Sequence, residues 1–385
     1  MKKKRILIFT GGGLSPALNS LLYGVIKSAQ EKNLEIMGGL FGWACLLNNN
    51  KIIDLTDFQA ETIKNIGGTF LRSSRTNPFK VADGIKQIKT NLVKNKIDAI
   101  VAIGGDDTLG TAYLLGKEEG IPIIGVPKTI DNDLSETYWT PGFPSAASYL
   151  ADYTWRIKNH AAYALSRIFI IESPGYKSGW LAAAGGLGGA DVTLPPEKII
   201  NCQNVLEKIQ KSYEKNGNYA TVIISQYAKF DEPIAGIDDN QNDQYNADRK
   251  TFIGLSFTEY LKKKLKKDVR SLHPANYLEA VDPTELDRDF SEKMGREAIE
   301  LLAREKYNSA VCLNRPDWTK KEIEVCRRPL ENMVGRGKYR FLDEEMFDFE
   351  NFIAKEKLKQ YLDPIFGIER STDEYDRLQK RIAKT

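Results

Sequence analysis

Two acidic stretches hold the residue types that could do chemistry in this chain. Gly104–Thr108 reads GGDDT and Pro127–Asp133 reads PKTIDND, and each directly follows or ends an apolar run. Such a run predicts a buried strand, and open α/β sheets bind ligands at the carboxyl ends of their strands. Together the two stretches supply four carboxylates, a lysine and glycine-rich backbone. These groups are suited to binding a metal-bound phosphate and to moving a phosphoryl group.

The carboxylates of the two stretches have different expected tasks. Asp106 is placed to hold Mg²⁺, because hard cations prefer carboxylate and water oxygens. The alternative is that Asp106 or Asp107 caps the helix that follows. If Thr129–Asp133 is extended, its threonine and its two aspartates project to one side, because strand side chains alternate. Two close carboxylates are costly without a cation, so we predict that they face an acceptor hydroxyl, Mg²⁺ and Lys128.

A glycine loop offers a further phosphate site. The glycines at 11–13 directly follow the apolar run 6–10. Glycine lets backbone N–H groups approach an anion at a helix N-terminus, although a tight turn between strand and helix is the alternative explanation. Ser15 could cap the next helix, and Pro16 could open it. Because the chain has no GxxxxGK[ST] motif, the loop is not of the P-loop type.

Length, charge and composition limit the other possibilities. At 385 residues the chain favours two lobes over one. A formal net charge of +3 gives no reason to expect nucleic acid, and no apolar segment approaches the roughly 20 residues that span a bilayer. We therefore expect a small-molecule partner, no nucleic acid, no membrane and a cytoplasmic location. With two histidines and four widely spaced cysteines, acid–base work falls to carboxylates rather than to a His triad or a CxxC site.

Short apolar runs alternate with longer amphipathic ones along the chain. The predicted strands are 6–10, 99–103, 122–126, 167–171 and 220–225, and the predicted helices are 16–30, 108–117, 146–159, 177–185 and 203–214. This alternation is typical of an α/β fold, predicted as two Rossmann-like lobes with mostly parallel sheets, helices on both faces and an active site in the cleft between them. The predicted divisions are 1–140, then 141–315, of which part of 251–305 could pack back on the first lobe, and a C-terminal extension 316–385. A stretch at 230–250, rich in Asp, Asn and Gln, is predicted to be a surface excursion.

As a set, these motifs resemble those of the phosphofructokinase family, and within it the pyrophosphate-dependent branch. The resemblance is carried by the acidic stretches and the glycine loop, and by Gly67–Thr69, Ser73–Phe79, Glu172–Ala184, Arg270–Arg288 and Pro329–Gly335. It implies reversible transfer of a phosphoryl group from pyrophosphate to the 1-hydroxyl of fructose 6-phosphate, with Mg²⁺. It also implies that 1–140 is the donor lobe, that 141–315 is the acceptor lobe, and that a homodimer or homotetramer shares its active sites.

The resemblance implies a role for each matched residue. Asp131 is the general base and Asp106 holds the metal, while Arg75 and Thr129 steady the transferring group and Lys128 supplies a point charge. The implied donor-binding residues are Gly11, Gly12, Gly13, Gly105, Asp107, Thr108 and Lys128. The implied substrate-binding residues are Thr129, Asp131, Asp133, Arg167, Pro174, Gly175, Tyr176, Gln226, Arg270 and Tyr277.

Two charged residues bear on the choice of donor. By the resemblance, ATP-using relatives have glycine at the positions of Asp107 and Lys128. A carboxylate at 107 would lie beside the α-phosphate of ATP, and a like-charge contact near 4 Å costs about 4 kcal/mol at an effective dielectric constant of about 20. Lys128 supplies a compact charge to a small, highly anionic donor. Both residues therefore favour pyrophosphate over ATP.

The acceptor side departs from the family pattern. Met-Gly-Arg is replaced by Pro174–Tyr176, and the Glu of Ser-Glu-Gly is replaced by Gln226. The segment Gly-Tyr-Leu-Gln-Arg, which helps to grip the sugar's 6-phosphate, reads Asn276–Ala280, so its arginine is missing and Glu279 adds negative charge if it faces inward. Three alternatives stay open. They are the same chemistry on another sugar or sugar phosphate such as sedoheptulose 7-phosphate, a weakly active or non-catalytic paralogue, and an NAD or lipid kinase, which would share the GGD turn but lack Thr129–Asp133.

Overall fold

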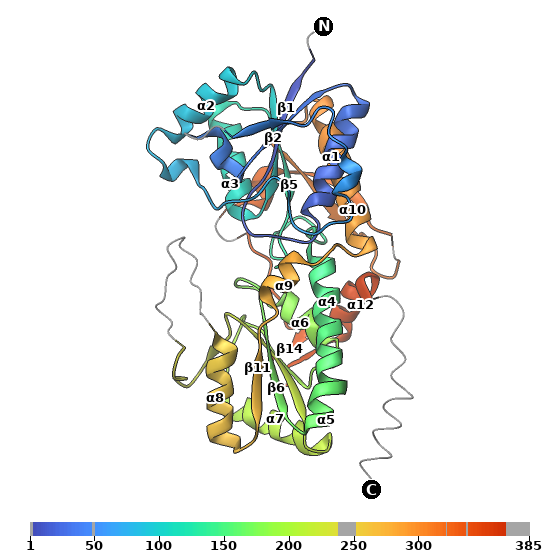
Figure 1. The fold of residues 1–385 in the computed structure, drawn as a ribbon. Coiled ribbons are helices and arrows are strands. Elements are labelled where there is room, and N and C mark those ends of the chain that lie inside the picture. The colour runs from blue at the N-terminus through green and yellow to red at the C-terminus, as the bar shows by residue number, and fades with distance from the viewer. Residues whose placement is uncertain (1–2, 48–50, 238–251, 321, 336–337, 367–385) are drawn as a thin grey trace. The chain divides into compact units, whose positions relative to one another are not determined.

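The chain divides into two compact units. The computed structural model describes residues 3–47, 51–237, 252–320, 322–335 and 338–366, so most of the predicted surface excursion at 230–250 lies outside the described residues. Unit 1 comprises Met1–Ala146 and Ala275–Phe341, and unit 2 comprises Ala147–Pro274 and Leu342–Thr385 (Figure 1). Each unit has its own sheet and its own hydrophobic core.

Unit 1 is built on a seven-stranded sheet. In spatial order its strands are β13 (Glu324–Pro329), β12 (Ser309–Asn314), β5 (Ile123–Pro127), β4 (Ala99–Gly104), β1 (Arg5–Thr10), β2 (Glu35–Gly39) and β3 (Ile52–Asp54). The strands from β12 to β2 run parallel, and β3 and β13 are antiparallel edge strands. The predicted strands 6–10, 99–103 and 122–126 match β1, β4 and β5 to within a residue.

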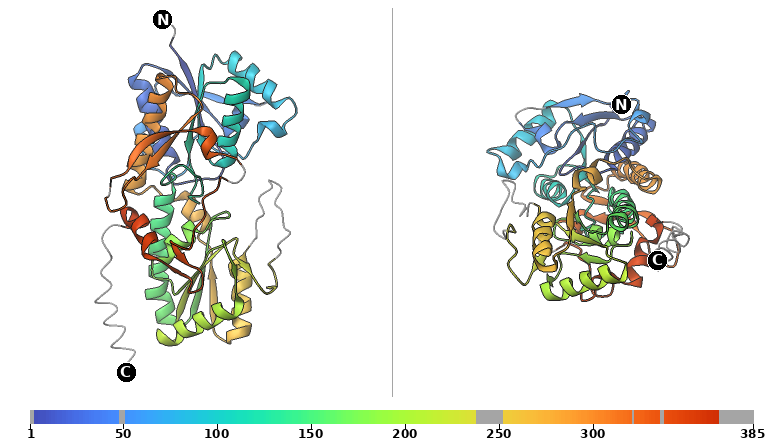
Figure 2. Two further views of the ribbon diagram at one scale, coloured as in Figure 1. Left: turned by 180° about the vertical axis from the view of Figure 1, so that it is seen from behind. Right: turned by 60° about the horizontal axis from the view of Figure 1, so that its bottom comes forward.

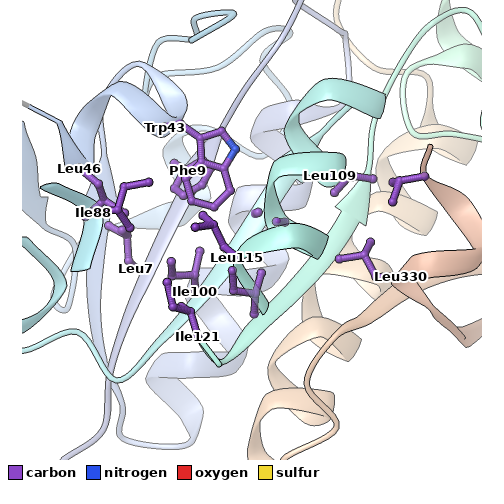
Figure 3. Close-up of a cluster of buried hydrophobic side chains, with 14 of the residues drawn as sticks. Leu7, Phe9, Trp43, Leu46, Ile88, Ile100, Leu109, Leu115, Ile121 and Leu330 are labelled. Carbon is purple, nitrogen blue, oxygen red and sulfur yellow. The ribbon is translucent and has the colours of Figure 1, made fainter. Parts of the chain in front are cut away.

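Helices cover both faces of this sheet. On one face, Phe9 of β1 packs with side chains of α2 (Gly84–Lys94), α3 (Asp106–Glu119) and the 3₁₀ turn η1 (Gly42–Leu46). The ring centroid of Trp43 in η1 lies 4.6 Å from that of Phe9 (Figure 3). On the other face, α1 (Leu18–Glu31) lies alongside α10 (Glu285–Ala303), as both views of unit 1 show (Figures 1 and 2). Because both faces of the sheet are covered, the β1 side chains that point to either face are buried.

The chain returns to unit 1 after unit 2, and α10 then packs against α1. A Cβ at Gly24 of α1 would lie 2.2 Å from the backbone oxygen of Glu292 in α10, so the two helices cross in backbone contact. Beyond α10, β12 pairs with β5 and β13 pairs with β12. The packing of α10 agrees with the expectation that part of 251–305 packs back on the first lobe. Residues 306–315, predicted in the acceptor lobe, and residues 316–341, predicted in a C-terminal extension, also belong to unit 1. The second part of unit 1, Ala275–Phe341, also contains α9 (Ala275–Ala280) and α11 (Leu330–Met333).

Unit 2 is built on a four-stranded parallel sheet. Its spatial order is β11 (Val269–Leu272), β6 (Ile168–Ser173), β9 (Ala220–Ser225) and β7 (Val192–Leu194). Side chains of α7 (Cys202–Lys215) and α8 (Ile253–Leu265) form a core on one face. On the other face, Gly185 of α6 (Trp180–Gly186) lies against Leu150 of α4 (Phe143–Arg156), a helix that begins in unit 1. The predicted α/β class, with mostly parallel sheets and helices on both faces, is confirmed.

The other elements are mostly short. They are η2 (Ala60–Thr62), η3 (Pro78–Lys80), the π-helical turn η4 (Ile157–Ala162), α5 (Tyr163–Leu165), β8 (Ile199–Ile200), β10 (Lys229–Phe230), β14 (Phe347–Asp348), β15 (Ile353–Ala354) and α12 (Glu356–Phe366). Within the described ranges, no helix is long and apolar enough to cross a membrane.

Candidate active site

Three loops that follow neighbouring strands lie side by side at the carboxyl ends of the parallel strands in the unit 1 sheet. β5, β4 and β1 are adjacent and parallel, so their carboxyl ends lie side by side. The glycine loop 11–13 follows β1, Gly105 and Asp106 follow β4, and Lys128–Asp133 follows β5. The two acidic stretches therefore lie at strand ends, as the apolar runs before them predict.

The glycine loop is packed tightly against its neighbours. The amide N–H of Gly11 donates to the carbonyl of Ile103 at 2.8 Å, and that of Gly12 donates to the carbonyl of Ser74 at 3.0 Å. Gly12 has a φ of +85°, and a Cβ at Gly11 would lie only 2.5 Å from Oγ1 of Thr108. Glycine is therefore required at Gly12 by the backbone conformation and at Gly11 by the close approach.

Helix α1 begins later than the sequence predicts. Its first residue is Leu18 and its N-cap is Ala17, so Pro16 does not open the helix. The hydroxyl of Ser15 donates to the carbonyl of Pro141 at 3.2 Å instead of capping the helix. The Ser15 hydroxyl thus bonds to a carbonyl that is distant in sequence, and α1 has no side-chain cap.

Lys128 connects the glycine loop with the second acidic stretch. The residue is 2% exposed, and its Nζ donates to the carbonyl of Gly13 at 2.5 Å. Burial lowers the pKa of Lys128 to about 8, the charges of Asp131 and Glu279 oppose this change, and the charge of Arg75 adds to it. A buried ammonium group therefore lies beside the glycine loop, within electrostatic reach of two carboxylates.

The second acidic stretch bends, so it lacks the extended form in which its threonine and two aspartates would project to one side. Oγ1 of Thr129 accepts a hydrogen bond from the amide N–H of Asp131 at 3.1 Å, which closes a tight turn. Asn132 has a φ of +55°, and its buried side-chain oxygen accepts a bond from the amide N–H of Thr140 at 3.3 Å. Strand alternation therefore does not decide where the side chains of this stretch point.

The bend nevertheless keeps the carboxylates of the two stretches close to one another. Burial raises the pKa of Asp133, and repulsion from the charge of Asp131 raises it further, with a smaller contribution from Asp106. Asp133 is thus within electrostatic reach of both Asp131 and Asp106. The predicted grouping of Asp106, Asp131 and Asp133 rests on this turn geometry rather than on an extended strand.

Asp106 lies in the first turn of α3, where Gly105 is the N-cap, so neither Asp106 nor Asp107 caps the helix. The hydroxyl of Tyr339 donates to Oδ2 of Asp106 at 2.8 Å, and the amide N–H of Gly335 donates to Oδ1 at 3.4 Å. Burial raises the pKa of Asp106, while these two hydrogen bonds lower it. Asp107 is exposed at the same helix end.

Arg340 holds the second acidic stretch through its backbone. The amide N–H of Arg340 donates to the carbonyl of Asp133 at 2.7 Å. Its guanidinium donates to the carbonyls of Asn132 at 3.0 Å and Thr137 at 2.9 Å. Tyr339 and Arg340 were not predicted as site residues. Around them the sequence reads GRGKYR, in which basic and aromatic residues lie between and after two glycines. This pattern could mark the segment, but it does not predict which distant loop the segment contacts.

The carboxylates fit a divalent metal that is bound together with phosphate. In the part of the chain that the structure describes, no three His, Cys, Asp or Glu side chains gather as a complete metal site. Mg²⁺, however, commonly binds through one or two carboxylates together with substrate phosphates and water. Burial raises the pKa of both Asp106 and Asp133, so a cation beside them would offset their charges. These residues therefore suit a metal that arrives with a phosphorylated ligand.

Helix α9 places Tyr277 and Glu279 in unit 1, although the resemblance assigned this motif to the acceptor lobe. Tyr277 is 54% exposed, whereas Glu279 is half-buried and its charge acts on Lys128. The end of the helix is fixed by close packing, because a Cβ at Gly67 would lie 2.2 Å from the backbone oxygen of Val281. Glu279 therefore contributes negative charge to the side of unit 1 that holds Lys128.

In unit 2, the predicted acceptor residues also follow strand ends. β6 and β9 are parallel neighbours whose last residues pair directly, so Pro174–Tyr176 and Gln226 leave the sheet beside one another. The ring of Tyr176 packs edge-on against that of Tyr227, with centroids 5.3 Å apart. Nζ of Lys177 lies 5.0 Å from the centroid of the Tyr176 ring. An aromatic pair and a lysine thus occupy the segment where the family pattern has Met-Gly-Arg.

Arg167 and Arg270 share one carboxylate in unit 2. Nε of Arg167 lies 2.6 Å from Oδ2 of Asp268, and Nε of Arg270 lies 3.3 Å from Oδ1 of the same side chain. All three side chains are between about a third and a half exposed. An anionic ligand that reaches the two guanidinium groups must therefore compete with Asp268.

Comparison with known proteins decides the family. Residues 5–302 match the model of the family described as phosphofructokinase. The chain belongs to the phosphofructokinase family. A pyrophosphate–fructose 6-phosphate 1-phosphotransferase of Dictyoglomus thermophilum is 34% identical over 342 residues, which cover 86% of this chain and 96% of that protein. An ATP-dependent 6-phosphofructokinase of Corynebacterium efficiens is 31% identical over 315 residues, which cover 81% of this chain and 90% of that protein.

The fold is shared with a solved member of the family. The crystal structure of a pyrophosphate-dependent phosphofructokinase from Marinobacter aquaeolei superposes with a TM-score of 0.82 at 22% identity, covering 95% of this chain and 92% of that chain. Phosphofructokinases transfer a phosphoryl group from a donor to a sugar phosphate, generally with a divalent metal cation. Family membership removes the alternative of an NAD or lipid kinase. Because similar relatives include users of pyrophosphate and of ATP, the donor must be inferred from this chain's own residues.

Proposed function

We propose that this phosphofructokinase transfers a phosphoryl group from pyrophosphate to the 1-hydroxyl of fructose 6-phosphate, reversibly and with Mg²⁺. The observation that carries the proposal is the buried ammonium of Lys128, which is bonded to the carbonyl of Gly13 and lies within electrostatic reach of Asp131. A compact point charge suits a short, highly charged donor. Asp107, exposed in the first turn of α3, adds a negative charge that disfavours the longer polyphosphate of ATP.

The proposed chemistry assigns one task to each group around the donor. Asp131 takes the proton of the acceptor hydroxyl while the hydroxyl oxygen attacks the phosphorus of the donor. Arg75, Thr129 and Lys128 stabilise the charge on the oxygens of the transferring group, because positioning and electrostatics dominate phosphoryl transfer. The amide N–H of Gly13, with Gly105 and Thr108 nearby, binds the donor phosphate that is left behind, because the N–H groups of Gly11 and Gly12 donate to Ile103 and Ser74.

The metal and the acceptor phosphate involve further residues. Asp106, with Asp133 nearby, would hold Mg²⁺, which would supply positive charge to the phosphate oxygens. Arg167 and Arg270 bind the sugar's 6-phosphate, and the family resemblance suggests that they do so across a subunit boundary in a homodimer or homotetramer. Their shared bond to Asp268 weakens this grip, because the carboxylate competes with the phosphate for the same guanidinium groups.

The test is phosphoryl transfer by the full chain with Mg²⁺. Pyrophosphate and ATP are compared as donors, with fructose 6-phosphate as acceptor, and fructose 1,6-bisphosphate is measured as product. We expect turnover with pyrophosphate and at most a trace with ATP. Turnover with ATP alone would refute the assignment of the donor. The reverse reaction, from fructose 1,6-bisphosphate and phosphate, is measured in the same buffer to test reversibility.

A second candidate is the same chemistry on a different acceptor. The observation that favours it is Glu279, whose charge acts on Lys128, together with the exposed Ala280 where the family pattern has arginine. A carboxylate near the reacting groups, without the arginine, disfavours an acceptor with phosphate at that place. The donor assay is therefore repeated with sedoheptulose 7-phosphate and with unphosphorylated sugars. A higher kcat/KM for one of these than for fructose 6-phosphate selects this candidate, and tight ligand binding without turnover of any acceptor selects a non-catalytic paralogue.

A further inference from the structure

A late segment of the chain is fastened to both acidic stretches at the sheet edge. Tyr339 forms an isolated antiparallel bridge with Leu134, just after the second stretch. Its hydroxyl bonds to Asp106 in the first stretch, 233 residues earlier in the sequence. Residues 338–340 thus connect two loops that follow different strands of the sheet.

The hydrogen bonds to Asp106 leave its two carboxylate oxygens unequal. Oδ2 accepts a bond of 2.8 Å from the Tyr339 hydroxyl, whereas Oδ1 accepts a longer bond of 3.4 Å from the amide N–H of Gly335. Tyr339 is half-buried, so water could satisfy its hydroxyl if the ring merely filled space. The hydroxyl is nevertheless directed at the carboxylate that begins α3. The hydrogen bond therefore orients the Asp106 side chain, and burial of the Tyr339 ring does not require it.

Arg340 acts on the second stretch in a complementary way. Its bonds go to backbone carbonyls of Asn132 and Asp133 at the bend and of Thr137 and Tyr138 after it. A backbone at positive φ, such as that of Asn132, is sparsely populated by residues other than glycine and persists where its surroundings hold it. Tyr339 therefore orients the Asp106 side chain of the first acidic stretch, and the adjacent Arg340 holds the backbone of the second.

We propose that Tyr339 is a positioning residue for the metal–diphosphate complex, and that its hydroxyl holds Asp106 so that Oδ1 is the oxygen presented to the metal. This inference rests on the proposed function, because it takes Asp106 as a metal ligand. Groups that orient a metal ligand from behind commonly contribute about 10- to 100-fold to metal affinity. Loss of the hydroxyl lets the carboxylate rotate and therefore weakens the metal complex without touching the acceptor.

The test measures Mn²⁺ binding directly, by water proton relaxation, in the presence of methylenediphosphonate, which cannot be cleaved to phosphate. Tyr339→Phe should bind Mn²⁺ about 10- to 100-fold more weakly than the wild type. In the catalytic assay, the same variant should need more Mg²⁺ for half-maximal rate while its KM for the acceptor stays the same. Tyr113→Phe is the matched control. Tyr113 lies on α3, the helix that Asp106 begins, and its hydroxyl accepts a bond from Lys117 and donates to Glu331 rather than to an acidic stretch.

The outcomes separate this inference from the proposed function. If Tyr339→Phe and the wild type bind Mn²⁺ equally with methylenediphosphonate, the inference is overturned and the proposed function stands. If the wild type itself binds no Mn²⁺ with methylenediphosphonate, the proposed function fails and the inference fails with it. A change in acceptor KM as large as the change in metal affinity also overturns the positioning role, because it indicates general damage to the site.

Discussion

Replacement of Lys128 by methionine gives a quantitative test of its burial. The folded-state pKa of about 8 lies about 2.5 units below the ordinary value of 10.5, and at about 1.4 kcal/mol per unit the buried charge costs roughly 3 kcal/mol of stability at neutral pH. Methionine removes this cost, but it also removes the bond to Gly13, where a charged donor contributes about 1.5 to 3 kcal/mol. The two changes nearly cancel at pH 7, so the pH dependence of stability is the informative quantity.

The sign of the pH dependence follows from the lowered pKa. Between pH 8 and 10.5 the unfolded chain still binds a proton at Lys128 that the folded chain has lost, so the stability of the wild type rises with pH in this window. The cost of the buried charge is fully present below pH 8 and is relieved by pH 10.5. Relative to Lys128→Met, the wild type should therefore gain up to about 3 kcal/mol across the window.

The assay is urea unfolding of both proteins, without ligand, at pH values from 7 to 11. Lys89→Met is the control for the loss of a lysine, because Lys89 is an exposed lysine of the same unit. Lys128→Met should also bind methylenediphosphonate more weakly than the wild type at pH 7. Parallel stability curves for the wild type and Lys128→Met between pH 8 and 10.5 would refute the buried, charged state of Lys128.

Three further predictions concern the general base, the donor and the helix crossing. Asp131→Asn should lower kcat about 100- to 10,000-fold through loss of the general base, while calorimetric binding of Mg²⁺ with methylenediphosphonate stays close to wild type; an unaltered kcat excludes this role. Asp107→Gly should raise kcat/KM for ATP relative to pyrophosphate by about tenfold or more, since a like charge near the longer donor is removed, and an unchanged ratio at constant ionic strength excludes Asp107 as a determinant. Gly24→Ala should lower the midpoint of thermal unfolding by several degrees, because the new Cβ would lie 2.2 Å from the Glu292 backbone oxygen. Gly110→Ala should not lower it, because a Cβ at Gly110 would lie in open space. Equal shifts for the two alanine variants contradict the close crossing of α1 and α10.

The elements and the placement of the motifs could be predicted from the sequence because they depend on local patterns. The apolar runs before Gly104 and through Val126 predict β4 and β5, and a motif that follows a strand in sequence must lie at its carboxyl end. Parallel neighbours then bring such motifs to one edge of the sheet. The grouping of glycines, aspartates and Lys128 in unit 1 follows from these short-range facts together with parallel strand order.

Other features could not be read from local pattern. Ser15 stands where it could cap a helix, yet its hydroxyl bonds to Pro141, which is distant in sequence. The stretch 129–133 alternates as a strand would, yet a hydrogen bond from Asp131 to Thr129 and the positive φ of Asn132 turn it. In each case a partner outside the local pattern, or a turn that competes with extension, offered a better set of hydrogen bonds than the regular structure.

The sequence by itself determined the family, the α/β class and the chemistry of the sheet edge, because residue types and their spacing along strands and loops are local properties. Only the tertiary structure decided that β12 and β13 complete the sheet of unit 1, because that assignment depends on the pairing of β12 with β5 and of β13 with β12. Only the tertiary structure brought Tyr339 to Asp106 across 233 residues. Such contacts arise from packing between surfaces that form after the elements do, and no spacing along the chain encodes them directly.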